Sequence, residues 1–472
     1  MRKATSLILI TLIVTGCALG PDYRRPAVDT PQAWRFAEEQ TADLVDTKWW
    51  EQFHDPVLNR LIAVALTKNK DLKIATARLE EYRARYRLAM AALFPQVGAA
   101  ASAGRQRSTE IGPVPLPADV DNPVNLYQGS VFASWEIDLW GRLRRGTEAA
   151  NADLLSTGEA RRAVILSLVT SVAGAYVNLR SLDRQLEISN ETAAARAESL
   201  RIFSLRYKEG FVSELELSQA KSLYDSAQAI VRVYMKAVAL QENALSVILG
   251  LNPGAVERGK PLGQLSLPVV PAGLPSDLLT RRPDIRQAEQ DLISANAQIG
   301  IARAQYFPTI SLTGMFGWES TSLSQLFTGP ARTWSWAVPV TQSIFAGGST
   351  AAQVKVTEAI RDEAVLQYQK VIQNAFRDVE DSLAGQRQTR EQLDAQAGQV
   401  ESLRTYARVA RLRYDNGYTS YIEVLDAERS LFDAELAYSQ SQGELFQALI
   451  NLYKAMGGGW VVTAEKMTAA PD

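Results

Sequence analysis

The side chains that carry most catalytic and metal chemistry are nearly missing from this chain. In 472 residues there is one cysteine, Cys17, and one histidine, His54. A zinc site needs three or four nitrogen or sulfur ligands, and nucleophilic catalysis needs a placed imidazole, so the sequence cannot supply a metal cluster, a disulfide framework or a redox pair of cysteines. An enzyme whose catalytic groups are all carboxylates would need neither cysteine nor histidine. However, no periodic pattern in the sequence places two carboxylates on the same site. We therefore predict a protein without enzymatic activity, metal or cofactor.

One segment of the sequence is similar to a nucleotide-binding motif, the phosphate-binding loop. The segment 254–261 reads GAVERGKP, close to the pattern GxxxxGK[ST]. Pro261 stands where the hydroxyl that binds Mg²⁺ should be, and no strand–loop–helix pattern surrounds it. We expect no ATP binding, so any energy that the protein uses must come from a partner. His54 is expected to be structural.

The N-terminus predicts export from the cytoplasm. Arg2 and Lys3 precede an apolar run, 7–14, that is too short to span a bilayer and is typical of a secretory signal. Val-Thr-Gly-Cys at 14–17 resembles a bacterial lipobox, in which the cysteine is acylated, and Ala18 permits sorting to the outer membrane in such proteins. We predict a covalent lipid, palmitate, on Cys17. For the apolar run itself, a buried N-terminal strand or helix is the alternative to a secretory signal.

The rest of the chain is a tandem repeat. Residues 71–97 align with 284–310 at one constant offset and share a Phe-Pro pair near the end, and 206–220 align with 413–427. A connector rich in proline and glycine lies between the halves. The predicted divisions are a signal peptide (1–16), a lipid-anchored N-terminal segment (17–54), repeat 1 (55–250), an equatorial connector (251–282), repeat 2 (283–459) and a C-terminal tail (460–472).

Each repeat reads as helix, two strands, long helix, tight turn and helix. The segments 141–209 and 348–416 contain no proline, so each can form a helix of about 100 Å at ~1.5 Å per residue. After each turn, apolar and small residues recur in alternating steps of four and three, which is the signature of a coiled coil. Two shorter helices are expected end to end beside each long one, with 54–93 providing one of them. An ordinary helical bundle would explain the periodicity but not the length.

Four segments alternate between apolar and polar residues in the manner of membrane strands. They are 127–139, 310–318, 334–340 and, more weakly, 96–104. A soluble, half-buried sheet is the alternative interpretation. Membrane barrels need at least about eight strands to close, so one copy cannot form a barrel, whereas two or three could.

The overall charge argues against a nucleic-acid partner. The chain has 50 basic and 52 acidic residues and a net charge of −2. Arg142, Arg144 and Arg145 are interpreted as the solvated start of a helix near the membrane rather than as a ligand site.

These features together resemble the TolC-like outer-membrane factor (outer-membrane efflux protein) family, in its OprM-type lipoprotein branch. The resemblance covers essentially all of the mature chain. It is carried by the lipobox, the duplication and the motifs WEIDLWGRLRR (135–145), LPSDLLTRRPDIRQAE (274–289), FPTISLTG (307–314), YTSYIEVLDAERSLF (418–432) and LYKAMGGGW (452–460).

The resemblance implies a mainly α-helical homotrimer in which a twelve-stranded β-barrel continues into a long periplasmic α-helical barrel. Such proteins are lipid-anchored in the outer membrane of Gram-negative cells and extend into the periplasm. They are passive exit ducts for small molecules, among them drugs or metal ions, delivered by an inner-membrane pump, expected to be proton-driven, and a periplasmic adaptor protein. An outer-membrane-anchored coiled coil or adhesin without transport remains the alternative, and the sequence does not identify the cargo.

The two tight turns are the predicted docking sites for the adaptor. Glycine ends a helix well in a left-handed conformation, and Ser213, Thr419 or Ser420 can cap the helix that follows. Capping does not explain exposed aromatic residues at the turns, and in the family these tips meet the adaptor. The docking residues are Gly210, Phe211, Val212, Ser213, Gly417, Tyr418, Thr419 and Ser420.

The resemblance also implies a gate at the periplasmic end. The family motif carries over to Arg413, Tyr414, Ile422 and Asp426. Asp426 lies about nine residues after the turn and Tyr414 only three before it, so at ~1.5 Å per residue they differ in height by roughly 9 Å. We therefore expect no direct contact between them within one hairpin, and expect Arg413 and Tyr414 to pair with a neighbouring hairpin or copy. Asp426 is expected to face its symmetry mates, which would attract cations. An ion pair between Asp426 and Arg429 on a solvated face is the alternative.

Overall fold

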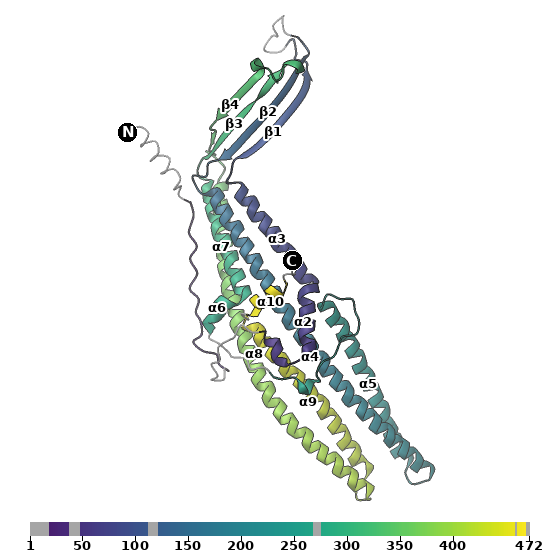
Figure 1. Cartoon of the computed structure of the whole chain (residues 1–472). Helices are drawn as coiled ribbons and strands as arrows, with labels where there is room; N and C mark the ends of the chain where they lie inside the picture. Colours follow the sequence, from purple (N-terminus) through teal and green to yellow (C-terminus); the bar gives the residue numbers. More distant parts are fainter. Residues whose placement is uncertain (1–17, 37–47, 112–120, 268–274, 458–459, 469–472) are drawn as a thin grey trace. The chain divides into compact units, whose positions relative to one another are not determined.

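A computed structural model describes residues 18–36, 48–111, 121–267, 275–457 and 460–468 (Figure 1). Cys17 and the predicted signal segment lie outside the described residues. The chain divides into two compact units, each of which takes segments from both repeats. Unit 1 comprises Met1–Ala27, Leu79–Thr157 and Ala288–Tyr368, and unit 2 comprises Val28–Arg78, Gly158–Gln287 and Gln369–Asp472.

Unit 1 contains an antiparallel sheet of strand order β1-β2-β3-β4, and within the described residues the outer edges of β1 and β4 have no strand partner. The predicted strands are confirmed in position, except that the fourth is divided. Pro339 interrupts it because proline has no N–H to donate, and its carbonyl accepts from Ser311 instead. The strands are β1 (Gln96–Gln106), β2 (Val124–Glu136), β3 (Thr309–Ser320), β4 (Arg332–Ala337) and β5 (Val340–Thr341), the last pairing with β3.

The two faces of this sheet differ sharply in polarity. The register pairs Val131 with Phe316, and Trp334 with the same Phe316, so these side chains share one face. The opposite face is mostly polar, although it also carries Phe132 beside Met315, and Val124 and Leu126 at one end of β2. The remaining large apolar side chains of the first face, here called the apolar face, are Val97, Tyr127, Trp135, Ile310, Leu312, Trp318, Trp336 and Val340.

The long helices are confirmed. Helices α4 (Arg142–Lys208) and α8 (Ser349–Asp415) have 67 residues each, which is about 100 Å at ~1.5 Å per residue. Each is followed by a 35-residue helix, α5 (Glu214–Ile248) or α9 (Tyr421–Ala455), which runs back from a tight turn (Figure 1). One stretch of α4 is apolar and long enough to cross a bilayer, but 61% of it is buried, so packing explains its composition.

The helix expected over residues 54–93 is broken at Asn69 into α2 (Pro56–Lys68) and α3 (Lys70–Ala91). The Asn69 side chain is the physical reason. Its oxygen accepts from the Leu72 N–H at 2.9 Å and caps α3, and its nitrogen donates to the Ile248 carbonyl at the end of α5 at 2.8 Å. In repeat 2 the corresponding helix, α7 (Pro283–Ala304), is preceded by one turn, α6 (Leu278–Arg281).

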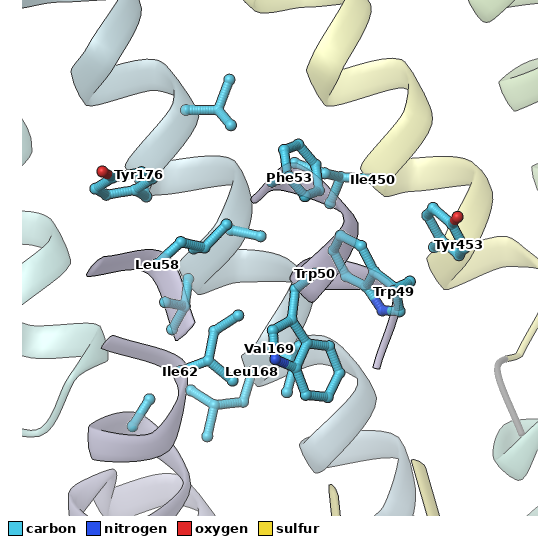
Figure 2. Close-up of a cluster of buried hydrophobic side chains, with 14 of the residues drawn as sticks. Trp49, Trp50, Phe53, Leu58, Ile62, Leu168, Val169, Tyr176, Ile450 and Tyr453 are labelled. Atoms are coloured by element: carbon cyan, nitrogen blue, oxygen red, sulfur yellow. The ribbon is translucent and has the colours of Figure 1, made fainter. Parts of the chain in front are cut away.

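The core of unit 2 is built from segments that are remote in sequence. Trp49 belongs to a short 3-10 helix, η1 (Trp49–Phe53), and stacks on Tyr453 of α9 at 4.7 Å. Trp460 contacts Trp50 edge to face at 5.4 Å. Figure 2 shows Trp49, Trp50 and Phe53 between residues of α4 and α9. The predicted C-terminal tail therefore begins as a helix, α10 (Trp460–Thr468), anchored in the core by burial of Trp460.

The connector between the repeats is irregular, as predicted. Its described part holds only short turns of helix, η2 (Leu262–Gln264), η3 (Pro275–Asp277) and α6. Arg282 is the last residue of the connector and fixes its end. Its guanidinium binds Asp284 at 2.6 Å, Asp378 at 3.1 Å and the Ala455 carbonyl at 3.0 Å.

Candidate functional site: hairpin tips, seam and N-terminal strap

Both hairpin tips in unit 2 present an aromatic side chain to solvent. Gly210 and Gly417 adopt positive φ angles of 77° and 75°, which L-residues rarely tolerate. The next residue in each turn, Phe211 or Tyr418, is 79% or 77% exposed. The turns are therefore specified by glycine, whereas the two exposed rings serve no packing purpose within one copy.

The two turns start the following helix differently. The Ser213 hydroxyl accepts from the Glu216 N–H, and the Glu216 carboxylate accepts from the Ser213 N–H at 2.8 Å, which completes a capping box. Ser420 occupies the cap position of α9 without a side-chain hydrogen bond, and Thr419 donates to Glu423 instead. The predicted capping by Ser213 is confirmed, while Ser420 does not cap.

An aromatic seam joins the two hairpins just behind the tips. Phe203 of α4 lies 4.2 Å from Tyr421 of α9, measured between ring centroids, and 6.3 Å from Tyr414 of α8. Tyr414 also lies 5.2 Å from Tyr421. Burial raises the pKa of Tyr421 to about 12, so its hydroxyl is neutral at physiological pH. Val212 from the first tip packs against this seam.

The predicted gate residues are not all brought together in one copy. Tyr414 contacts the neighbouring hairpin, as expected. Arg413 does not, because its guanidinium lies 3.4 Å from Glu423 of its own hairpin. Ile422 is 63% exposed, and Asp426 pairs with Arg429 at 3.1 Å, which is the alternative that the sequence left open. The gate role of these residues stays a prediction.

The contact between the two hairpins also includes a buried arginine, Arg196, that the sequence analysis did not identify. Arg196 of α4 is buried, lies 5.2 Å from the Phe432 ring of α9 and donates to the Leu223 carbonyl at 3.2 Å. Glu428 lies 3.9 Å from Arg411 of α8, and burial raises the pKa of this carboxyl. Arg196 gave no signal in the sequence, because an arginine within a long helix is normally solvated.

The loop that approaches a phosphate-binding motif is filled by the protein's own groups. The Gly259 N–H donates to the Tyr176 hydroxyl at 2.9 Å, and the Lys260 N–H donates to the Asp55 carboxylate at 3.0 Å. Asp55 is fully buried and also accepts from the Tyr176 hydroxyl at 2.7 Å. A carboxylate thus occupies the place where a phosphate would need to bind.

The basic start of α4 is not fully solvated, which corrects the sequence interpretation. Arg142 and Arg144 pair with carboxylates at 2.7 and 3.3 Å. Arg145 is 5% exposed and donates to the Leu19 carbonyl at 3.1 Å and to the Asp22 carboxylate at 2.8 Å. The reason is that residues 18–25, here called the N-terminal strap, pass over this helix start and remove Arg145 from water.

The strap is held along its length within unit 1. Leu19 donates its N–H to the Trp140 carbonyl at 3.0 Å, and Asn296 donates to the Pro21 carbonyl at 2.8 Å. A Cβ on Gly300 would come within 2.5 Å of the Leu19 carbonyl, so glycine is required for this approach. Farther along, Arg25 binds Glu289 of α7 through two nitrogens.

Comparisons with known proteins show similarity over nearly the whole chain. The family model described as outer membrane efflux protein matches residues 61–251 and 274–458, once in each repeat. The probable efflux pump outer membrane protein TtgC of Pseudomonas putida is 38% identical over 97% of this chain and 96% of its own length. The cation efflux system protein CusC of Escherichia coli is 35% identical, over 96% of this chain and 97% of its own.

Solved structures show the same similarity. The MtrE outer membrane channel of Neisseria gonorrhoeae, in its open state, has a TM-score of 0.85 and 32% identity, covering 94% of this chain and 99% of its own. The CmeC outer membrane channel of Campylobacter jejuni has a TM-score of 0.90 and 25% identity, covering 96% of this chain and 98% of its own.

A sheet with one apolar face, joined to helices of about 100 Å with exposed tips, defines a protomer of an outer-membrane channel. The chain belongs to the outer membrane efflux protein family. It is an outer-membrane efflux channel, and the alternative of a coiled coil or adhesin without transport is not supported.

Proposed function

We propose that this chain is the exit duct of a tripartite efflux system and acts as a homotrimer. The sheet supports this most directly, because it has one apolar face, one mostly polar face and two edge strands without partners among the described residues. Exposed edges must be paired or covered, and a closed membrane barrel needs at least about eight strands. Three copies of the four-stranded sheet would give twelve strands with the apolar face toward lipid.

The hairpin tips are proposed to receive a periplasmic adaptor, which would link the duct to an inner-membrane pump. Phe211 and Tyr418 support this role because both are large, more than three-quarters exposed and follow a glycine that fixes the turn by its positive φ. Aromatic side chains placed in this way are typical anchors of protein interfaces. The aromatic seam behind them would carry the effect of docking to the gate.

The gate is proposed to comprise Arg413, Tyr414, Ile422 and Asp426. In a trimer, three copies of Asp426 around a narrow axis would attract cations and repel one another. Arg429, 3.1 Å from Asp426, would weaken this ring without abolishing it, since both side chains are more than half exposed.

The lipid on Cys17 is also a proposal. Ala18, the next residue, lies against Gly141 at the start of α4, where a Cβ would come within 2.7 Å of the Ala18 Cα. Ala18, the neighbour of the proposed attachment residue in the sequence, therefore lies close to the junction of β2 and α4. Palmitate labelling of the wild type but not of Cys17→Ser tests the attachment, and unlabelled wild type would contradict it.

The cargo is proposed to be small molecules. Relatives carry names that refer to toluene and antibiotics, at 38% identity, and to cations, at 35% identity. These names span chemically different cargoes, so the adjacent pump rather than the duct is expected to select among them.

One experiment tests the duct and the docking sites together. In a host that lacks its own exit duct, the wild type should restore efflux, and the purified protein should conduct in planar bilayers. Phe211→Asp combined with Tyr418→Asp should lose efflux and adaptor cross-linking but retain trimers and conductance, whereas Phe211→Tyr combined with Tyr418→Phe should retain all four. Absence of conductance by the wild type would overturn the duct, and wild-type cross-linking by the Asp variant would overturn the docking sites.

A further inference from the structure

The charged residues of the sheet are segregated by face. Strands β1 to β5 contain two basic residues, Arg105 and Arg332, and two acidic ones, Glu136 and Glu319. Arg105 is in register with Asn125, and Arg332 is in register with Trp318, which places both arginines on the apolar face. Both acidic residues lie on the opposite, mostly polar face.

Both arginines also lie toward one end of the apolar face. The strands enter from and return to the helices at the end where Trp135 and Leu312 pair, and the hairpin connections lie at the other end. From Trp135 to Tyr127 the strand rises about 27 Å at ~3.4 Å per residue, or about 21 Å across a membrane at a tilt of ~40°. Arg105 lies two positions beyond the partner of Tyr127, at the hairpin end.

Neither arginine is neutralised within one copy. Both are exposed, and neither forms an ion pair with a carboxylate in the part of the chain that the structure describes. By contrast, Arg107, just beyond β1, lies 3.5 Å from Glu110. A lone cation at the edge of an apolar band would lose hydration without gaining a partner, unless a group outside the chain supplies the negative charge.

We propose that Arg105 and Arg332 bind the phosphate groups of a phosphorylated lipid in the outer leaflet of the outer membrane. This proposal rests on the proposed barrel, in which the apolar face meets lipid. Because the helices extend into the periplasm, the hairpin end of the sheet is the external end. The partner is therefore amphipathic, with acyl chains on the apolar face and a phosphate at the level of the guanidinium groups.

Charge and geometry favour this occupant over a soluble anion. A guanidinium group binds phosphate oxygens in a bidentate manner, and Trp318, in register with Arg332, supplies the amphipathic ring that is typical of a membrane interface. The arginines lie on the two outer strands, β1 and β4. Closure of a barrel by β1 of one copy against β4 of the next would bring an Arg105 and an Arg332 to neighbouring strands, so one lipid could contact both.

The test measures lipid binding to the purified full-length trimer. Native mass spectrometry would quantify binding of a bisphosphorylated diglucosamine lipid (lipid A) and of the same lipid without its phosphates. At ~1 kcal/mol per arginine near an anionic surface, each Arg→Gln change should weaken binding about fivefold, and Arg105→Gln with Arg332→Gln about 25-fold. Arg232→Gln with Arg408→Gln, which removes two exposed arginines from α5 and α8, is the charge-matched control and should bind as the wild type does.

The outcomes separate the proposal from its alternatives. Equal affinity of the wild type and the double variant, equal loss in the control variant, or equal binding of the dephosphorylated lipid would each overturn it. Displacement of the lipid by millimolar glucosamine phosphate would show a site for soluble anions and would overturn the assignment to lipid. Conductance is measured on the same samples, so a failure of the duct itself is recognised separately from a failure of this site.

Discussion

Arg145 offers a sharp test of how the N-terminal strap is held. The Arg145→Ala variant removes the guanidinium that binds the Leu19 and Gly20 carbonyls and the Asp22 carboxylate. Arg142→Ala is a matched control, because the guanidinium of Arg142, at the same helix start, binds Glu136 at 2.7 Å. We expect Arg145→Ala to release the strap locally while the sheet and the unit 2 core remain folded.

The magnitude follows from the bonds that are lost. Each strap carbonyl left without its donor should cost about 1–1.5 kcal/mol, the upper part of the range for an ordinary hydrogen bond, because the released carbonyl can bind water instead. The ion pair with Asp22 adds about 0.5 kcal/mol at most, because the Asp22 side chain is 89% exposed. The strap should therefore open more easily by about 2–4 kcal/mol once the lost packing of the arginine stem is included. At ~1.4 kcal/mol per factor of ten, this is about a 30- to 700-fold change.

Hydrogen exchange of the strap amides measures this change directly. The Leu19 N–H is protected by its bond to the Trp140 carbonyl, so its exchange rate reports opening of the strap. It should rise about 30- to 700-fold in Arg145→Ala, and amides around Val169 in the unit 2 core should not change. An unchanged Leu19 rate, or an equal rise in Arg142→Ala, would refute this account of the strap.

Three further predictions concern the gate, the seam and the core. Asp426→Ala should raise the resting conductance and lower the cation preference in planar bilayers; wild-type values for both would rule out the gate assignment. Burial raises the pKa of Glu428, so its carboxylate destabilises the fold once pH exceeds the ordinary value near 4.5. Glu428→Gln should therefore stabilise the protein in urea at pH 7 but hardly at pH 4, and equal effects at both would contradict this. Trp49→Ala should destabilise by about 3–5 kcal/mol, seen as a lower Tm, and a change below about 1 kcal/mol would disprove its core role.

Periodicity and duplication predicted most of the fold, because periodicity depends on residues that are close together in the sequence and the duplication shows the same pattern twice. The two long helices follow from segments without proline and a sustained apolar repeat, and the strands follow from alternation over about ten residues. Glycine and serine at the tips predicted the two tight turns, and Gly210 and Gly417 do adopt the left-handed conformation.

Contacts between remote segments could not be predicted in this way. The break at Asn69 depends on a carbonyl of α5, far along the chain. Burial of Arg145 depends on the strap, and anchoring of Trp460 depends on Trp49 and Trp50. Each of these residues has an ordinary surface or tail interpretation until its partner is known, so local pattern alone assigned them wrongly or not at all.

The equal lengths of the paired helices limit how such a protein can change in evolution. Both hairpins of unit 2 arise from a 67-residue helix followed by a 35-residue one, and the aromatic seam requires both tips to end at matching positions. Loss of seven residues from α4 alone would shorten it by about 10 Å and would move Phe203 out of reach of Tyr421. Viable insertions and deletions are therefore expected as matched pairs in both halves, and related genes should vary in length by correlated steps.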